Sequence, residues 1–216
     1  MTIEIKMLTL GMVSTNAYIV GDTETKQAIL IDPVDNAKLL LETAQENGWT
    51  IELILATHGH FDHVLASKEL KELTNAPFYI HKADLPFLER LPETGEMYAG
   101  KKFPEAAIPD RFLTDESETI EVGAIKLETI FTPGHAPGHI AFLMREQNVV
   151  FSGDCLFAGS IGRTDLPAGD YDQLMQSIVN NLLTLDDDVN VLPGHMQPTT
   201  IGRERKTNPF ILSYGS

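Results

Sequence analysis

Residues 57–63 read T-H-G-H-F-D-H, which places three of the chain's seven histidines and an aspartate in one short stretch. The apolar run I-E-L-I-L-A-T leads directly into it. Side chains two apart in extended backbone point the same way, so His58 and His60 can chelate one metal ion. His63 begins the next helical pattern and, beside Asp62, would face a second ion. The stretch therefore predicts a metal site at the end of a buried strand.

Two imidazoles do not complete the coordination sphere of a zinc ion, so further ligands are expected elsewhere in the chain. Three later apolar runs end in such donors: L-E-T-I-F continues into T-P-G-H, N-V-V-F-S-G into an aspartate, and V-N-V-L into P-G-H. The donors are His135, Asp154 and His195. Because α/β folds build their sites where strands end, we expect these residues to join the first four.

Four segments of this sequence resemble the metallo-β-lactamase superfamily, in order and over nearly the whole chain: T-H-G-H-F-D-H, T-P-G-H-A-P-G-H, S-G-D and L-P-G-H. The resemblance is closest to the glyoxalase II (hydroxyacylglutathione hydrolase) branch, since G-D-C-L-F-A-G-S-I-G-R-T-D is similar to its motif after the bridging aspartate. It implies an α/β fold, a four-layer αβ/βα sandwich. From the length we expect a single domain over 1–216.

The resemblance also implies a set of ligands for two divalent metal ions. Three residues would hold one ion, three the other, and one would bridge them: His58, His60 and His135; Asp62, His63 and His195; and Asp154. Nitrogen and oxygen ligands suit Zn, Fe and Mn, so zinc is the first expectation and iron or manganese stay open. Asp62 and Asp154 are the residues expected to take part in catalysis.

The expected chemistry is hydrolysis of a small acyl thioester such as S-lactoylglutathione. Two metal ions can share a bridging hydroxide, because metal binding lowers the pKa of water from 15.7 to near 7. A thiol of pKa about 8.5 leaves as an anion, so no separate general acid is needed. An iron-dependent persulfide dioxygenase is the first alternative, since that branch shares the fold, the ligands and G-R-T-D. A lactone, other ester or RNA phosphodiester hydrolase is the second.

The residue after the bridging aspartate bears on a β-lactamase function. In the secreted lactamases of this fold a cysteine or serine stands where this chain has Asp154. Here the cysteine is the neighbour, Cys155, and we expect a buried structural thiol. Together with the absence of a signal-peptide pattern, this argues against a β-lactamase.

Other residues are expected to orient the ligands or to contact the substrate. His139 is a recurring partner in this family and is expected to be structural, as is His81, which follows the strand F-Y-I. Arg163 and Asp165 in G-R-T-D either fix the loop that carries the site or form an ordinary salt bridge.

The substrate contacts are expected in two places. The segment 91–112 lacks regular periodicity, and it is either a lid carrying Tyr98 and Phe103 or a surface excursion. Full-length glyoxalase II enzymes have a C-terminal helical extension. Only about twenty residues follow His195 here, so this sequence resembles a short form without the extension. Three basic residues of this tail either hold a substrate carboxylate or face solvent: Arg203, Arg205 and Lys206.

Composition limits the partners. The net charge of −15 disfavours nucleic acid, and no apolar run approaches the roughly 18 residues of a membrane span. One cysteine excludes an intramolecular disulfide and favours a cytoplasmic location. We therefore expect a small-molecule thioester as the partner, without nucleic acid or membrane, and a monomer or small homo-oligomer. Helical patterns are expected between short strands, at 36–47, 64–74, 82–90 and 170–184.

Overall fold

The computed structural model describes residues 2–214 and divides the chain into two units. Unit 1 comprises the residues through Leu113 together with Glu121–Lys126. Unit 2 comprises Thr114–Ile120 and the residues from Leu127 onward. Each unit is a sheet with helices, so the predicted mixed α/β class is confirmed. The single domain over 1–216 stays a prediction, and each unit is described by itself.

Unit 1 is built on a six-stranded sheet in the order β1-β2-β3-β4-β5-β6. The strands are β1 (Ile3–Leu10), β2 (Thr15–Asp22), β3 (Gln27–Ile31), β4 (Thr50–Leu55), β5 (Phe78–His81) and β6 (Arg111–Leu113). β1 to β3 are antiparallel, whereas β3, β4, β5 and β6 are parallel to one another. Because parallel strands end at the same edge, the residues that follow β3, β4 and β5 meet there. This edge carries the histidine stretch.

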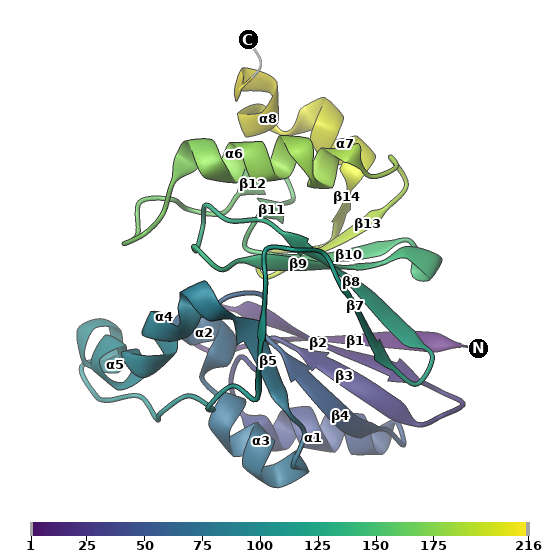
Figure 1. The fold of residues 1–216 in the computed structure, drawn as a ribbon, viewed down its shortest axis with the longest axis vertical. Coiled ribbons are helices and arrows are strands. Elements are labelled where there is room, and N and C mark those ends of the chain that lie inside the picture. Colours follow the sequence, from purple (N-terminus) through teal and green to yellow (C-terminus); the bar gives the residue numbers. More distant parts are fainter. Residues whose placement is uncertain (1, 215–216) are drawn as a thin grey trace. The chain divides into compact units, whose positions relative to one another are not determined.

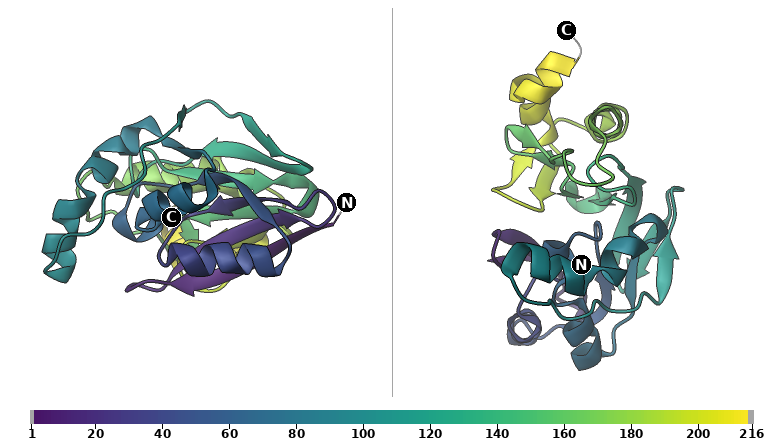
Figure 2. Two further views of the ribbon diagram at one scale, coloured as in Figure 1. Left: turned by 90° about the horizontal axis from the view of Figure 1, so that it is seen from below. Right: turned by 90° about the vertical axis from the view of Figure 1, so that its left-hand side faces the viewer.

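The helices of unit 1 are α1 (Ala37–Glu46), α2 (Phe61–Val64), α3 (Ser67–Thr74), the 3-10 helix η1 (Lys82–Asp84), α4 (Leu85–Glu89) and α5 (Leu91–Ala99). α1 and α3 lie side by side on one face of the sheet (Figures 1 and 2). Leu40 of α1 and Leu70 of α3 are fully buried there, in one cluster with Ile54 of β4. Burial of each such side chain stabilises the fold by about 1.5–3 kcal/mol. This packing holds the strands whose ends carry the candidate ligands.

The segment 91–112, expected to be irregular, is helical in its first half, so that expectation is wrong for α5. Pro92 lies in the first turn, where its missing N–H costs nothing, and Gly100 ends the helix with a φ of 67°. Gly95 lets the following loop approach closely, since a Cβ there would lie 2.3 Å from the backbone nitrogen of Phe103. Leu91 is buried in the core of unit 1 and Ala99 packs against it, but Gly95 between them has no side chain, so the apolar periodicity of this helix is weak.

The second six-stranded sheet has the order β14-β13-β10-β9-β8-β7, and there is a short pair β11-β12. These strands belong to unit 2, except for the end of β7 and the start of β8, which fall within Glu121–Lys126 of unit 1. The strands are β7 (Thr119–Val122), β8 (Ile125–Phe131), β9 (Ile140–Met144), β10 (Val149–Gly153), β11 (Leu156–Phe157), β12 (Ser160–Ile161), β13 (Asn190–Pro193) and β14 (Thr199–Thr200). β10 and β13 are parallel, and β9 is antiparallel to both of its neighbours β8 and β10. β8, β10 and β13 therefore run in the same direction and end at one edge.

The helices of unit 2 are the 3-10 helix η2 (Arg145–Gln147), α6 (Tyr171–Asn180), the 3-10 helix η3 (Leu182–Thr184), α7 (Ile201–Thr207) and α8 (Pro209–Tyr214). α6 lies over the sheet (Figure 1), with Leu174 and Ile178 in one buried cluster with Leu143 and Val191. Asp170 caps α6 by accepting the backbone N–H of Gln173. Across residues 2–214, none of the helices combines the length and apolarity needed to cross a membrane.

Candidate metal centre

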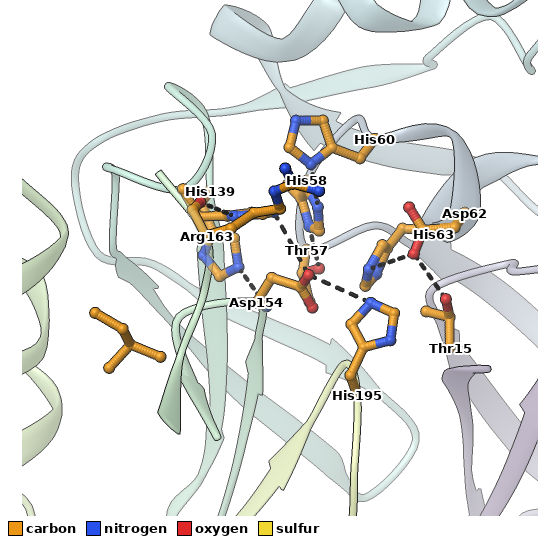
Figure 3. A network of polar contacts seen from close by, with 12 residues as sticks. Thr15, Thr57, His58, His60, Asp62, His63, His139, Asp154, Arg163 and His195 are labelled. Carbon is orange, nitrogen blue, oxygen red and sulfur yellow. Dashed lines mark hydrogen bonds and ion pairs between the residues drawn. The ribbon is translucent and has the colours of Figure 1, made fainter. Parts of the chain in front are cut away.

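The loop after β4 and the short helix α2 present four potential ligands on unit 1. His58 Nε2 lies 3.1 Å from His60 Nδ1, and Asp62 Oδ2 lies 3.4 Å from His63 Nε2. The imidazole centroids of His58 and His63 are 4.1 Å apart. Figure 3 shows the four side chains of this loop gathered in one place. The expectation that His58 and His60 point the same way agrees with this geometry.

Asp32, directly after β3, fixes the proton positions of two of these histidines. Its buried carboxylate accepts hydrogen bonds from His63 Nδ1 (2.9 Å), from the hydroxyl of Thr57 (3.0 Å) and from the Thr57 backbone N–H (2.7 Å). Since the Thr57 hydroxyl donates to Asp32, it accepts from His58 Nδ1 at 3.0 Å. Both histidines therefore carry their proton on Nδ1 and leave Nε2 with a lone pair for a metal ion.

Two further contacts hold the same loop. The Thr15 hydroxyl donates to Asp62 Oδ2 at 2.7 Å (Figure 3), and the Gly59 backbone N–H donates to the buried Asp84 at 2.8 Å. Sequence reasoning missed Asp32, Thr15 and Asp84. Asp32 directly follows β3, Thr15 is the first residue of β2, and Asp84 is the last residue of η1. The acidic residue after the run A-I-L-I was a local signal for Asp32.

Unit 2 contributes Asp154, which directly follows β10, with a histidine on either side of its carboxylate. Asp154 Oδ2 lies 3.5 Å from His135 Nε2. It lies 3.4 Å from His195 Nε2 (Figure 3). The predicted rule that strand exits carry the donors therefore holds within this unit. One carboxylate close to two imidazoles can ligate together with both.

Hydrogen bonds also hold Asp154 and His135 in place. The backbone N–H of Asp154 donates to His139 Nε2 at 3.0 Å, so the His139 proton is on Nδ1, which donates to the Thr132 hydroxyl at 2.8 Å. His139 is thus a neutral, buried histidine whose Nε2 accepts from the turn that carries Asp154; its structural role stays a prediction. His135 Nδ1 donates to the carbonyl of Arg163 at 2.7 Å, which again leaves Nε2 for a metal ion.

The donor spacing fits metal ions. Two nitrogen or oxygen ligands at 2.0–2.1 Å from a tetrahedral ion lie about 3.3 Å from each other. The four separations within the units, between 3.1 and 3.5 Å, are close to this value. The donors are also of the type that Zn, Fe and Mn accept, imidazole and carboxylate.

Arg163 and Asp165 form an exposed bidentate ion pair, with both N–O distances 2.8 Å. The hydrogen bond from the Arg163 guanidinium lowers the pKa of Asp165 to about 2. Because the Arg163 carbonyl accepts from His135, the pair lies on the segment that orients this histidine. The contact to His135 is made by the Arg163 backbone and not by the ion pair, so both predicted roles of the pair stay open.

The residues predicted to contact substrate lie partly in unit 1 and partly in unit 2. Phe103 is buried in the core of unit 1, and Tyr98 is half exposed, 5.3 Å from the ring of Phe61. In unit 2, Arg205 donates to the carbonyls of Leu183 and Leu185, and both Arg205 and Lys206 pair with Asp187, whereas Arg203 is exposed. His81 accepts the Ala83 N–H at the start of η1, a structural position.

Cys155 is fully buried, as predicted, and burial raises the pKa of its thiol. A buried, protonated thiol reacts slowly with disulfide reagents. We therefore expect no labelling of the native chain by Ellman's reagent over minutes, and one equivalent in 6 M guanidinium chloride. Rapid labelling of the native chain would show that the thiol is accessible and contradict this placement.

Comparisons with known proteins identify the family of this chain. The model of the metallo-beta-lactamase superfamily matches residues 10–195. The chain is 40% identical over 199 residues to the hydroxyacylglutathione hydrolase GloC of Haemophilus influenzae, covering 92% of this chain and 93% of that protein.

Solved structures share the fold. The BLEG-1 B3 metallo-beta-lactamase matches with a TM-score of 0.90 and 36% identity, covering 96% of this chain and 99% of that one. The di-iron-bound form of TTHA1623 matches with a TM-score of 0.84 and 39% identity, covering 95% and 99%. The predicted fold class is therefore confirmed, and the chain belongs to the metallo-β-lactamase superfamily.

Proposed function

We propose that this chain hydrolyses small acyl thioesters of the hydroxyacylglutathione type with the help of two divalent metal ions. The observation that carries the proposal is the Asp154 carboxylate with His135 Nε2 and His195 Nε2 each within 3.5 Å. A carboxylate that reaches two separate imidazoles suits a bridge between two ions. The similarity to GloC, whose name specifies hydroxyacylglutathione hydrolysis, supports the substrate class.

The proposed ligands are those predicted from the sequence, with zinc as the first metal to test: His58, His60, Asp62, His63, His135, Asp154 and His195. When bound, such ions lower the pKa of water and polarise a carbonyl oxygen. The chain's own part is to keep each imidazole in one tautomer. Asp32 does so for His63, and the Arg163 carbonyl does so for His135. This leaves no proton to remove from the ligating nitrogens when a metal binds.

Cys155 does not compete as a nucleophile. Its side chain is fully buried and the pKa of its thiol is raised, so the thiolate is scarce at neutral pH. A small-molecule thioester is the proposed partner, and the net charge of −15 speaks against nucleic acid.

The similarity to two solved structures suggests two alternative activities, and the test includes both. TTHA1623 was solved in a di-iron-bound form, so iron chemistry such as persulfide oxidation is one of them. BLEG-1 is described as a B3 metallo-beta-lactamase, so β-lactam hydrolysis is the other. The retained His139 supports the thioesterase over the dioxygenase, since we expect this histidine to be replaced in the latter.

The experiment compares three substrates on one preparation. The zinc form and the iron form are each given S-lactoylglutathione, glutathione persulfide and nitrocefin, with thiol release, oxygen uptake and absorbance as the readouts. We expect the kcat/KM for thiol release by the zinc form to exceed the kcat/KM of the other two activities by at least about a hundredfold. Oxygen uptake or nitrocefin hydrolysis as the dominant activity would reject the proposal.

A further inference from the structure

The side chain of Glu204, on α7, is fully buried. Its Oε2 accepts the backbone N–H of Gly159 at 2.8 Å and the side-chain N–H of Asn208 at 2.9 Å. Its Oε1 accepts the hydroxyl of Thr199 at 2.6 Å. Across residues 2–214, no basic side chain forms an ion pair with this carboxylate. A buried charge without a counter-charge is costly unless hydrogen bonds replace its lost water, so these three bonds account for its position.

Glu204 and Asn208 together hold the turn between β11 and β12. Glu204 accepts the Gly159 N–H, and Asn208 Nδ2 also donates to the carbonyl of Ser160 at 2.9 Å. Each strand of this hairpin has only two residues. Even a two-stranded hairpin of ordinary length is only marginally stable by itself. The hairpin therefore needs support from outside, and the end of the chain supplies it.

The segment 154–163 contains this hairpin and reaches two candidate histidine ligands of unit 2. The carbonyl of Arg163 accepts the hydrogen bond from His135 Nδ1 at 2.7 Å. The ring of Phe157 lies edge-to-face with the ring of His195, with the centroids 5.9 Å apart. Contacts of this kind orient an imidazole that ligates a metal ion. The position of the hairpin thus bears on both rings.

The hairpin also packs against the backbone of Asp154, with which the segment begins. The Gly162 N–H donates to the carbonyl of Cys155 at 3.3 Å. A Cβ at Gly162 would collide with the carbonyl oxygen of Asp154 and lie 3.2 Å from His135 Nδ1. Because this packing leaves no room for a side chain, a shift of the hairpin would displace Asp154 and His135 as well.

We propose that Glu204 is a positioning residue for the candidate metal ligands of unit 2. Its carboxylate holds the turn of the hairpin, and the hairpin holds the imidazoles of His135 and His195 and the backbone of Asp154. None of its three hydrogen bonds goes to a ligand, so Glu204 acts through the hairpin and takes no part in bond cleavage. The inference rests on the ligand set of the proposed function.

Two substitutions of Glu204 test the hydrogen bonds themselves. Glu204→Leu removes the acceptors of all three bonds. Glu204→Gln keeps the three contacts, because the amide oxygen can accept from Gly159 and Asn208 while the amide N–H donates to the hydroxyl of Thr199. The geometry is therefore retained in Glu204→Gln although the charge is lost.

Two further variants control for loss of stability. Thr129→Val is the matched control, since Thr129 is also buried in unit 2 and its hydroxyl accepts the backbone N–H of Glu118 at 2.9 Å, away from the hairpin. Asn208→Ala removes the bond to the Ser160 carbonyl and one of the three bonds of Glu204. This milder variant decides the question if Glu204→Leu does not fold.

The first readout needs no metal ion. It is the rate at which the ring proton on His135 Nδ1 exchanges with water, observed by nitrogen-15 NMR of the metal-free chain. His63 Nδ1, which donates to Asp32 in unit 1, gives a reference in the same spectrum. A general loss of stability accelerates the exchange of both protons, whereas a displaced hairpin accelerates that of His135 alone. The second readout is the Kd of zinc, measured by competition with a chromophoric chelator.

In Glu204→Leu we expect the His135 proton to exchange at least about tenfold faster than in wild type, His63 to be unchanged, and the zinc Kd to rise about tenfold. Asn208→Ala should change the His135 exchange rate and the zinc Kd in the same direction, by about threefold. Both values should stay within about twofold of wild type in Glu204→Gln and Thr129→Val, although Thr129→Val unfolds at a lower urea concentration.

A His135 proton that exchanges as in wild type in both Glu204→Leu and Asn208→Ala would overturn the inference. Equal acceleration at His135 and His63 would do the same, as would a wild-type zinc Kd in Glu204→Leu. Failure of the proposed function looks different, because a wild-type chain that hydrolyses no thioester leaves the NMR comparison of the metal-free chains unchanged.

Discussion

Replacing Asp154 with alanine is expected to remove both metal ions from the chain. The Asp154 carboxylate lies within 3.5 Å of the ligating nitrogens of His135 and His195, so its loss affects every ligand pair in unit 2. The zinc-loaded variant, passed through a desalting column, should retain less than about a tenth of the zinc found in wild type. Loss of a ligand typically costs more than the 10–100-fold of a residue that only orients one. Metal content per chain is measured by mass spectrometry.

His81→Ala is the matched control for this variant. His81 is also a buried histidine at a strand end, but it caps η1 and is not among the predicted ligands. It should retain the zinc content of the wild-type chain. Retention of two ions by Asp154→Ala would contradict the bridging assignment, as would equal loss in both variants.

Replacing Asp32 with alanine is expected to lower the free energy of unfolding of the metal-free chain by about 3 kcal/mol. The change leaves the buried His63 and Thr57 without the acceptor of three hydrogen bonds. Removing one partner from a buried charged network costs about 3–5 kcal/mol. Urea unfolding measures the loss, and Asp188→Ala, at an exposed aspartate before β13, serves as the control.

Asp32→Asn distinguishes the effect on folding from the effect on the metal. Asparagine tolerates the φ of 57° found at this position, so this variant should be the more stable of the two. An asparagine no longer supplies the charged acceptor that fixes the His63 tautomer, and zinc affinity should fall about 10–100-fold. A zinc affinity equal to that of wild type in Asp32→Asn would show that Asp32 has no role in orienting His63.

The sequence was sufficient for the features that depend on strand exits. T-H-G-H-F-D-H follows β4, and Asp154 and His195 follow the parallel strands β10 and β13. In each case an apolar run fixes the strand and the next residues must lie at its edge, so local pattern and site position are linked. The four predicted helical patterns correspond to α1, to α3, to η1 with α4, and to α6 with η3, because the spacing of apolar residues is also a local signal.

Features that depend on contacts between distant residues were not predictable. Asp32 lies 31 residues before His63 in the chain. It contacts His63 only because the ends of β3 and β4 are adjacent in the sheet. In α5, Gly95 lies against the backbone of Phe103, and β6, three residues long, pairs with β5; neither contact is visible in the local sequence. α7 and α8 were also missed; the Thr200 cap of α7 was a local signal that periodicity alone does not use.

The most direct test of the central claim is a zinc titration of the chelator-stripped chain, with thiol release from S-lactoylglutathione as the readout. The account predicts no release without metal and a rate that rises to a plateau at two equivalents of zinc per chain. Release by the metal-free chain, or no release at any zinc concentration, would contradict it.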